Sequence, residues 1–583
     1  MEYRYRIEDA TFSDQTVVAL KDLVVLIGPN NCGKSRALKD LVALTCTDNP
    51  DPVVICAAQH TRPRDAEPLA NQYGIKPTRG SDGGLLFRSL QPTLVGENHY
   101  NLAKLRWPED CGHIMRDAGV FKLRFAPQLT AFLTTENRLS LVSENDSARH
   151  ASAAQHLLQV FYDAGPEEEL RLRKLVKAAF PPIEVALDFT IAGRIQFRIG
   201  EDFSALPPDP RQAKPVLSGC KRLDDQGDGL RSYVGLLAAL TALNRPVFLI
   251  DEPEAFLHPP QAFRIGELIA KEASGDKQII VATHSADVLR GIIFNSTSAQ
   301  IIRIDRIGDS NTVRVLDQAE LKTLVNDPLL SAAGVLDGLF YSGVIVTEAD
   351  GDARFFQTLS RKLQPSLDLH FVNADNKQTV PKVLAPYKRL GVRCAGIVDI
   401  DVLNEKEEFR KQLQAAGLDG AQFAAALAAQ DSIAAEINAT PPVDRLSDAA
   451  KRLSEMVEAV RTASSASRED QDKALAKVRR DSERLKADAS AWKEIKKEGA
   501  SSLRKSREEF DKLYEICSEA GLFINPSGEL ESSLAGYGVA WESDKRTWMT
   551  RALQLLVGLS PDNERQPWKL IDDVHNHLAR NKT

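Results

Sequence analysis

A glycine-rich segment near the start of the chain constrains its fold more than any other feature. Gly28-Pro29-Asn30-Asn31-Cys32-Gly33-Lys34-Ser35 satisfies the pattern GxxxxGK[ST] in full. The apolar run at 22–27 predicts a buried strand before it, and a helix is expected after it. In that context backbone N–H groups wrap phosphates, the lysine reaches the β and γ phosphates, and the serine binds Mg²⁺. The predicted phosphate-binding residues are Gly28, Asn30, Asn31, Gly33, Lys34 and Ser35.

A second part of a nucleotide site is expected about 200 residues further on. The apolar run 247–250 predicts a strand that leads into Asp251 and Glu252. In such a site the first carboxylate holds Mg²⁺ through water, and the second orients or deprotonates the attacking water. His284 follows the next predicted strand, Gln278–Ala282, and is expected to contact the γ-phosphate. The competing interpretations are a solvated turn for the acidic pair and a structural role for the histidine.

These segments together resemble the ABC-type ATPases, in the branch shared with SMC and recombination ATPases. The signature loop departs from that family, because Leu217-Ser218-Gly219 stands too far before Asp251. Gln226-Gly227-Asp228-Gly229 has the family's spacing and precedes a helix expected from residue 230. The resemblance therefore makes Gly227, Asp228 and Gly229 nucleotide contacts. Since this loop completes the site of a second subunit in the family, it also implies a homodimer or a tetramer formed through the ATPase domain.

Carboxylates follow predicted strands in the second half of the chain as well. Glu348 comes just after the apolar run 344–346, and Asp399 and Asp401 come after 395–398. Ligand sites gather at the carboxyl ends of parallel strands. Two side chains at spacing i, i+2 on an extended backbone point to one face, where their charges repel unless a cation lies between them. A third acidic segment, 528–531, ends at Glu531. Hard oxygen ligands favour Mg²⁺ or Mn²⁺ over zinc.

This order of acidic segments resembles a Toprim domain, and an ABC-type ATPase followed by a Toprim domain is the layout of the OLD (overcoming lysogenization defect) family. Ala349 stands where Toprim domains commonly have glycine. By resemblance the metal ligands are Ser35 and Asp251 in the first half, and Glu348, Asp352, Asp399, Asp401 and Glu531 in the second. The resemblance also implies a lysine that stabilises charge on the transferring phosphate, for which Lys545 is the candidate, with a surface lysine as the alternative. Asp350 is expected to point away from the metal.

The expected fold is α/β, with an ABC-type ATPase domain at 1–338 and a Toprim (Rossmann-like) domain at 339–583. Residues 405–518 are rich in Ala, Glu, Lys, Arg and Ser and predict a helical insertion within the second domain. Its basic and acidic residues are nearly balanced, which favours a solvated helical hairpin over an arm that contacts nucleic acid.

Composition limits the classes of protein and the cell compartment that fit this chain. The charged residues comprise 74 Lys and Arg against 81 Asp and Glu, a net charge of -7, which excludes a simple basic coat but not nucleic-acid binding. Seven scattered cysteines without a CxxC pair favour reduced thiols in the cytoplasm. The charged N-terminus and the short apolar runs indicate no signal peptide and no membrane span.

The resemblance implies a DNA endonuclease that binds and hydrolyses ATP, uses Mg²⁺ or Mn²⁺, and acts in bacterial anti-phage defence, as in Gabija-type (Gabija A subunit) and retron-associated systems. An accessory defence protein or a retron component is then an expected partner. Two alternatives stay open: a non-catalytic scaffold that senses ATP within a defence complex, and a nuclease that cleaves RNA. The residues do not decide whether ATP activates or inhibits cleavage.

Overall fold

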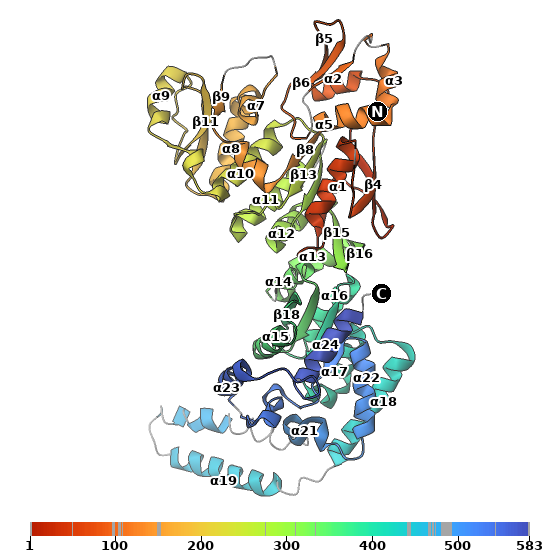
Figure 1. The fold of residues 1–583 in the computed structure, drawn as a ribbon. Coiled ribbons are helices and arrows are strands. Elements are labelled where there is room, and N and C mark those ends of the chain that lie inside the picture. The colour runs from red at the N-terminus through yellow and green to blue at the C-terminus, as the bar shows by residue number, and fades with distance from the viewer. Residues whose placement is uncertain are drawn as a thin grey trace. The chain divides into compact units, whose positions relative to one another are not determined.

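The structure, a computed structural model, divides into two compact units, Met1–Pro328 and Leu329–Thr583 (Figure 1). It describes residues 3–48, 50–95, 99–102, 106–107, 109–147, 153–273, 276–308, 310–332, 334–439, 445–463, 468, 471–472, 474–479, 492–542 and 544–580. The boundary expected at 338/339 lies ten residues beyond the division between the two units, and the hydroxyl of Tyr387 donates a hydrogen bond to the carbonyl of Val335 within the second unit. No helix among these residues is long and apolar enough to cross a membrane. All seven cysteines are free thiols.

A six-stranded sheet organises the first unit, in the order β16-β15-β3-β14-β13-β8. All its neighbouring strands are parallel except β15 and β16. The strands β3 and β14 are buried along their whole length, as expected for a sheet covered on both faces. The prediction of a parallel α/β sheet is therefore confirmed. Its strands are β3 (Leu23–Ile27), β8 (Thr130–Leu133), β13 (Val247–Asp251), β14 (Gln278–Ala282), β15 (Gln300–Ile307) and β16 (Ser310–Leu316).

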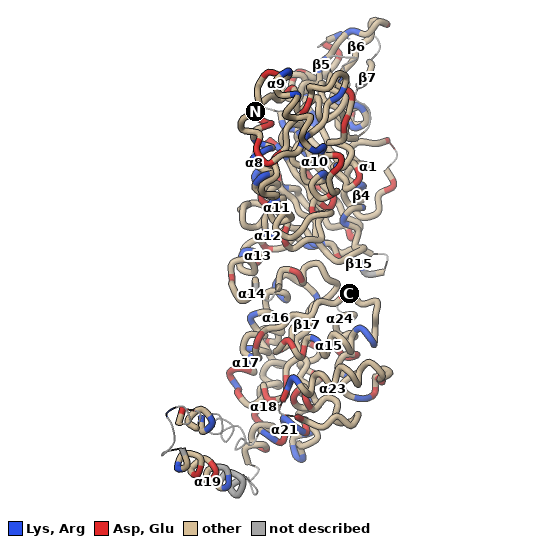
Figure 2. Tube along the Cα trace, turned by 90° about the vertical axis from the view of Figure 1, so that its left-hand side faces the viewer, with Lys and Arg blue, Asp and Glu red and all other residues tan. Residues whose placement is uncertain are grey.

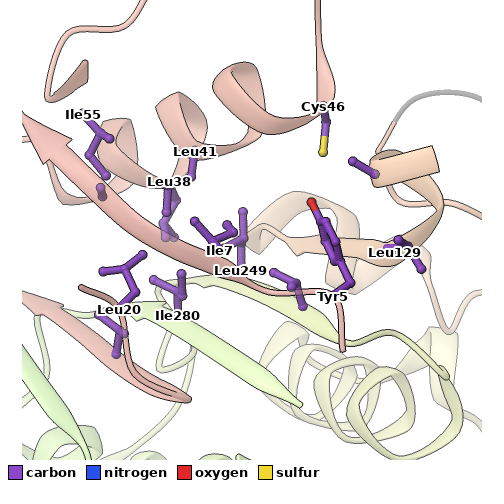
Figure 3. Close-up of a cluster of buried hydrophobic side chains, with 14 of the residues drawn as sticks. Tyr5, Ile7, Leu20, Leu38, Leu41, Cys46, Ile55, Leu129, Leu249 and Ile280 are labelled. Atoms are coloured by element: carbon purple, nitrogen blue, oxygen red, sulfur yellow. The ribbon is translucent and has the colours of Figure 1, made fainter. Parts of the chain in front are cut away.

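The main core of this unit lies around helix α1 (Lys34–Cys46), which follows the glycine-rich segment (Figure 3). Leu38 and Leu41 of α1 pack with Ile7 of β1 (Ile7–Phe12), Leu249 of β13 and Ile280 of β14. Truncating one such buried leucine to alanine typically costs about 2–5 kcal/mol. This packing fixes the start of α1 against the sheet.

Smaller sheets and helices complete the first unit. The sequence between 80 and 150 carries few clear signals, and the antiparallel strands there and at 184–222 were not predicted. Besides β1, the strands of the first unit outside the six-stranded sheet are β2 (Val17–Ala19), β4 (Ile55–His60), β5 (Ile75–Arg79), β6 (Leu85–Ser89), β7 (His99–Leu102), β9 (Asn145–Asp146), β10 (Glu184–Asp188), β11 (Arg194–Gly200) and β12 (Lys221–Arg222). The helices are α2 (Glu67–Tyr73), α3 (Cys111–Arg116), α4 (Ala118–Val120), α5 (Ala126–Leu129), α6 (Thr135–Ser140), α7 (Leu157–Ala164), α8 (Pro166–Ala179), α9 (Pro210–Ser218), α10 (Asp228–Ala242), α11 (Pro259–Glu272), α12 (Ala286–Asn295), α13 (Gln318–Asn326) and α14 (Pro328–Ala332), the last of which enters the second unit.

A four-stranded parallel sheet in the order β18-β17-β19-β20 forms the centre of the second unit. Because every neighbouring pair is parallel, the carboxyl ends of all four strands meet at one edge. Helix α15 begins at Asp350, slightly earlier than the helix expected from residue 352. The strands are β17 (Gly343–Thr347), β18 (Leu369–Asn373), β19 (Cys394–Val398) and β20 (Leu522–Ile524), and the helices around them are α15 (Asp350–Leu363), α16 (Val380–Arg389), α23 (Lys545–Gly558) and α24 (Trp568–Arg580).

Among the described residues between β19 and β20, the regular elements are helices and no strand is present. Its helices are α17 (Lys406–Ala415), α18 (Gly420–Ala439), α19 (Arg445–Ala463), α21 (Lys493–Glu498) and α22 (Arg507–Glu519). Residues 440–444 and 480–491 of the expected insertion lie outside the described residues.

One carboxylate ties two of these helices together. Glu436 of α18 accepts hydrogen bonds from the backbone N–H groups of Arg504, Lys505 and Ser506, at 2.8, 3.0 and 2.7 Å. The hydroxyl of Ser506 donates a further bond at 2.6 Å. Burial alone would raise the pKa of Glu436, but these donors outweigh it and lower the pKa to about 2. The side chain therefore caps the start of α22 from a different helix.

We expect Glu436→Gln to lower the free energy of unfolding at pH 7 by about 1–2 kcal/mol, the usual worth of a helix cap. Because the folded pKa is depressed, this contribution exists above the unfolded pKa of about 4.3 and disappears as the pH falls towards about 2. Denaturant unfolding of the full chain at pH 7 and pH 3 measures it. Glu455→Gln on the exposed face of α19 is the control, and an equal loss in both variants would contradict the cap.

Candidate nucleotide and metal sites

The glycine-rich segment forms a loop that requires glycine at two of its positions. A Cβ on Gly28, whose φ is 142°, would stand 2.1 Å from the carbonyl oxygen of Ile304. A Cβ on Gly33, whose φ is 99°, would stand 2.7 Å from Cγ2 of Val54. Asn31 also has a positive φ, at 60°. Glycine is therefore required at both positions.

Lys34 and Ser35, at the end of this loop, both donate hydrogen bonds within the first unit. Lys34 donates from Nζ to the carbonyl oxygens of Gly28 and Pro29, both at 2.8 Å. The hydroxyl of Ser35 donates to Oδ1 of Asp251 at 2.8 Å, across the sheet. Burial raises the pKa of Asp251, while the bond from Ser35 opposes the rise. The structure thus brings together the two residues predicted to bind Mg²⁺, and their oxygen atoms suit that ion.

Glu252 and His284 stand at the ends of the neighbouring strands β13 and β14. Nδ1 of His284 lies 3.6 Å from Oε1 of Glu252 and 3.2 Å from Oε1 of Glu254. Glu254 is buried and accepts hydrogen bonds from the hydroxyl of Thr283 and the N–H of His284, both at 2.8 Å. Burial raises its pKa. Sequence reasoning missed Glu254, which orients the histidine; its place two residues after Glu252 was the available signal.

A buried cation also stands behind the acidic pair. Arg138 of α6 is fully buried and donates to the carbonyl oxygens of Asp251 and Glu252, at 2.6 and 2.8 Å. Its Nε donates to the hydroxyl of Ser232 in α10 at 3.2 Å. Burial lowers the pKa of Arg138 to about 10, so it stays charged at neutral pH. Glu252 has a φ of 46°, an uncommon backbone conformation for a residue with a side chain, and Arg138 helps to hold it there.

The predicted signature loop lies at the start of α10, the helix that Arg138 contacts. The helix begins at Asp228 rather than at 230, so Asp228 and Gly229 belong to its first turn. Gly227 and Asp228 are exposed. A Cβ on Gly229 would stand 2.5 Å from the carbonyl oxygen of Phe256, whereas a Cβ on Gly227 would meet nothing within 4 Å. Gly229 therefore serves close packing, and Gly227 faces open space.

In the second unit, three strand ends bring carboxylates together. Oε1 of Glu348, after β17, accepts a hydrogen bond from the N–H of Asp399, after β19, at 2.8 Å. Asp352 accepts from the N–H of Ala349 at 3.1 Å. Burial raises the pKa of Glu348, Asp352 and Asp399, and the negative charges of their neighbours raise it further. Glu348, Asp352 and Asp399 thus repel one another. The prediction of an extended backbone through Asp401 is wrong, because the chain turns into a 3-10 helix, Ile400–Asn404, directly after Asp399.

Glu531 and Lys545 complete this cluster. Glu531, after β20, is almost fully buried, and its Oε2 has no hydrogen-bond partner among the described residues. Nζ of Lys545, the first residue of α23, lies 3.4 Å from Oε1 of Glu531. The Lys545 side chain is exposed, but its ammonium is partly desolvated by the protein around it, which would lower its pKa; Glu531 and the other carboxylates outweigh this effect and raise the pKa. Asp350 lies apart, exposed and paired with Arg354 at 2.9 Å.

Two lysines that sequence reasoning missed also reach the cluster. Nζ of Lys496, in α21, lies 2.8 Å from Oδ2 of Asp401 and 2.9 Å from Oε1 of Glu529. Nζ of Lys377 lies 3.3 Å from the same oxygen of Asp401. Lys496 belongs to a segment of near-balanced charge, and nothing in its sequence context distinguishes it from its neighbours. The tertiary fold, and not a local sequence pattern, places these lysines beside the cluster.

The ligand atoms that the second site offers are of the kind that bind a hard divalent cation. Its side chains offer oxygen atoms alone, and the unpartnered oxygen of Glu531 is a buried acceptor that lacks a donor. Within the described residues, no three His, Cys, Asp or Glu side chains already form a ready-made metal site. Oxygens of Glu348, Asp352 and Asp401 are engaged by backbone N–H groups and lysines, so a bound ion requires these side chains to rearrange.

Comparisons with known proteins agree with parts of this description. Residues 218–290 match the family described as "AAA domain, putative AbiEii toxin, Type IV TA system", so the first unit carries an ATPase-type domain. The Old nuclease of Escherichia phage P2 is 24% identical over 169 residues, which cover 27% of this chain and 28% of that protein. The match thus spans little more than a quarter of the curated relative's length.

Solved structures of SMC heads are similar over about half of the chain. One is the SMC head domain from Thermotoga maritima, at 13% identity over 54% of this chain and 100% of that chain, with a TM-score of 0.29. Another is the Smc head domain with an extended coiled coil from Pyrococcus furiosus, bound to the C-terminal domain of ScpA, at 11% identity over 55% and 99%, with a TM-score of 0.32. At these scores the likeness supports no further conclusion.

We expect Arg138→Gln to reduce the kcat of ATP hydrolysis by about 10- to 100-fold, because the carbonyls that position Glu252 lose their donor. The affinity for ATP should change little, since Lys34 and Ser35 are untouched. Steady-state kinetics with separate kcat and KM values measure this, and Arg138→Lys should recover part of the rate. Arg116→Gln at an exposed helix end is the control; a folded Arg138→Gln protein with normal kcat would contradict the role.

Proposed function

We propose that this protein is a nucleotide-regulated, divalent-metal-dependent DNA endonuclease of the OLD type. One observation carries the proposal: carboxylates from three parallel strand ends converge at one edge of the sheet in the second unit, beside Lys545. An ATPase-type domain precedes them in the same chain. The partial match to a protein called a nuclease supports the same conclusion.

The second unit is proposed to be a Toprim domain. Glu348, Asp352, Asp399, Asp401 and Glu531 would hold Mg²⁺ or Mn²⁺, which when bound supplies Lewis-acid stabilisation of a phosphodiester under attack. Lys545 is well exposed, at 72% of its side chain, so its ammonium can also reach a phosphate outside the cluster. It would neutralise charge that develops on the phosphate oxygens.

The first unit is proposed to be an ABC-type module that controls the second. Lys34 and the loop N–H groups would hold the phosphates of ATP, Ser35 and Asp251 would hold Mg²⁺, and Glu252 with His284 would position the attacking water. Gly227 and Asp228 are exposed at the start of α10, where a second copy of the chain can be reached. The proposed assembly is therefore a homodimer or tetramer formed through this unit.

A role in anti-phage defence, with an accessory protein or retron component, is the biological setting that we propose from the OLD-type layout. A non-catalytic scaffold and an RNA nuclease are the other outcomes of the tests that follow.

We expect Glu348→Gln and Asp399→Asn each to reduce cleavage of plasmid DNA in Mg²⁺ or Mn²⁺ by more than about 100-fold, because each removes a negative ligand of the proposed ion. Gel assays with DNA and with RNA measure this, and ATP binding should be unchanged. Asp350→Asn, an exposed carboxylate beside the same strand, is the matched control. Full cleavage by both site variants would contradict the proposed metal site. If the natural chain cleaves RNA and not DNA, the protein is an RNA nuclease. If the natural chain cleaves neither, a non-catalytic scaffold is favoured.

Gly227→Glu should leave the monomer folded, because a side chain there meets nothing within 4 Å, yet it should block nucleotide-dependent association. Light scattering with a non-hydrolysable ATP analogue measures the mass. Gly558→Glu, at the end of α23 and also in open space, is the control. If Gly227→Glu associates as the natural chain does, the loop does not form the interface.

A further inference from the structure

The lysines of α21 gather on one side of that helix. At about 100° per residue, Lys493, Lys496 and Lys497 span roughly a quarter to a third of the helix circumference, while Glu494 and Glu498 occupy the adjacent side. Figure 2 shows basic positions at α21. Lys496 points to the carboxylates Asp401 and Glu529, as its two ion pairs show. The next residue, Lys497, makes a different contact.

Lys497 lies over the ring of Trp541, with Nζ 4.4 Å from the ring centroid. Trp541 is 36% exposed, whereas Trp492, Trp548 and Trp568 are buried. An exposed indole with an ammonium on its face is not required by the core, because its side chain belongs to none of the buried clusters. Lys497 and Trp541 therefore form a surface pair, which we call the α21–Trp541 pair.

Both segments that form this pair also supply a cation to the carboxylate cluster. Lys496, next to Lys497, contacts Asp401, and Lys545, shortly after Trp541, contacts Glu531. The pair is thus connected over short stretches of chain to two members of the cluster, Asp401 and Glu531. A polymer with a negative backbone and flat rings would meet an ammonium, an indole face and the cluster in close succession.

We propose that the α21–Trp541 pair binds an unpaired nucleotide of the nucleic-acid strand that enters the carboxylate site. The base stacks on the free part of the Trp541 ring, and Lys497 binds the adjacent phosphate. The inference rests on the proposed nuclease function and adds the form of its substrate: a single-stranded or locally opened segment, since a base inside a duplex cannot stack on a side chain. Single-stranded DNA and RNA share this chemistry.

A protein partner would use the surface differently. Exposed aromatic residues at protein interfaces are normally surrounded by a larger apolar patch. The neighbours of Trp541 include the charged residues Lys497 and Glu542, and Glu542 is paired with Arg551 at 2.9 Å. A ring flanked by these charged side chains suits a base and its phosphate better.

The test measures binding of the full-length protein to short oligonucleotides in EDTA, where cleavage is blocked, by anisotropy of a labelled strand. The ligands are oligothymidylate, oligouridylate, an abasic strand of equal length, and a duplex. Trp541→Ala should weaken binding of the base-bearing strands by about tenfold, the usual worth of one stacked base, and leave the abasic strand unchanged. Trp541→Phe should retain most of the affinity, because it keeps a stacking face.

Lys497→Gln should weaken the binding of base-bearing and abasic strands alike. It should also reduce the salt dependence of binding by the equivalent of about one phosphate contact. Lys411→Gln, on the exposed surface of α17, is the matched control. Equal affinity of Trp541→Ala and the natural chain for base-bearing strands, or binding of the duplex alone, would overturn the inference. Plasmid cleavage by the natural chain separates the two claims. If the natural chain cleaves plasmid and Trp541→Ala binds as tightly as the natural chain, only this inference is wrong. If the natural chain neither cleaves plasmid nor binds the strands, the proposed function is wrong as well.

Discussion

Repulsion between carboxylates of like charge governs the second unit. Its parallel sheet brings the ends of β17, β19 and β20 to one edge; Glu348 and Asp399 follow β17 and β19 directly, and Glu531 lies seven residues after β20, in the 3-10 helix Leu530–Ser532. Recessed acids at such spacing raise one another's pKa and favour any cation that can approach. Two lysines from different helices, Lys496 of α21 and Lys545 of α23, supply positive charge to the cluster. A divalent ion would relieve the same repulsion more fully.

The first unit also places acidic side chains at the ends of parallel strands, but its buried cation contacts the backbone instead of the carboxylates. Its sheet aligns the ends of β3, β13 and β14, which places Ser35 against Asp251 and His284 beside Glu252. Here the buried cation is Arg138, and it acts on backbone carbonyls rather than on carboxylates. It also touches α10, which carries the exposed Gly227. A change at the start of α10 can therefore reach the acidic pair through a single side chain.

The parts of this account that the sequence predicts are local in the chain. The strand, loop and helix around Lys34 and the strand before Asp251 can be recognised because each is one contiguous pattern, and the structure has them at those places. Contacts made by distant residues left no such pattern. Lys496 reaches Asp401 only because the helical segment folds back onto the strand ends, and Arg138 reaches Asp251 from an element with few sequence signals.

The central claim is that the carboxylate cluster of the second unit is a divalent-cation site. Anomalous diffraction from crystals of the full chain soaked in Mn²⁺ tests it directly. The account predicts a peak within reach of Glu348, Asp399 and Asp401, together with a shift of the Lys496 ammonium away from its present 2.8 Å contact with Asp401. A peak beside Ser35 and Asp251 in crystals that also contain ATP, with none at the cluster and Lys496 unmoved, would contradict it.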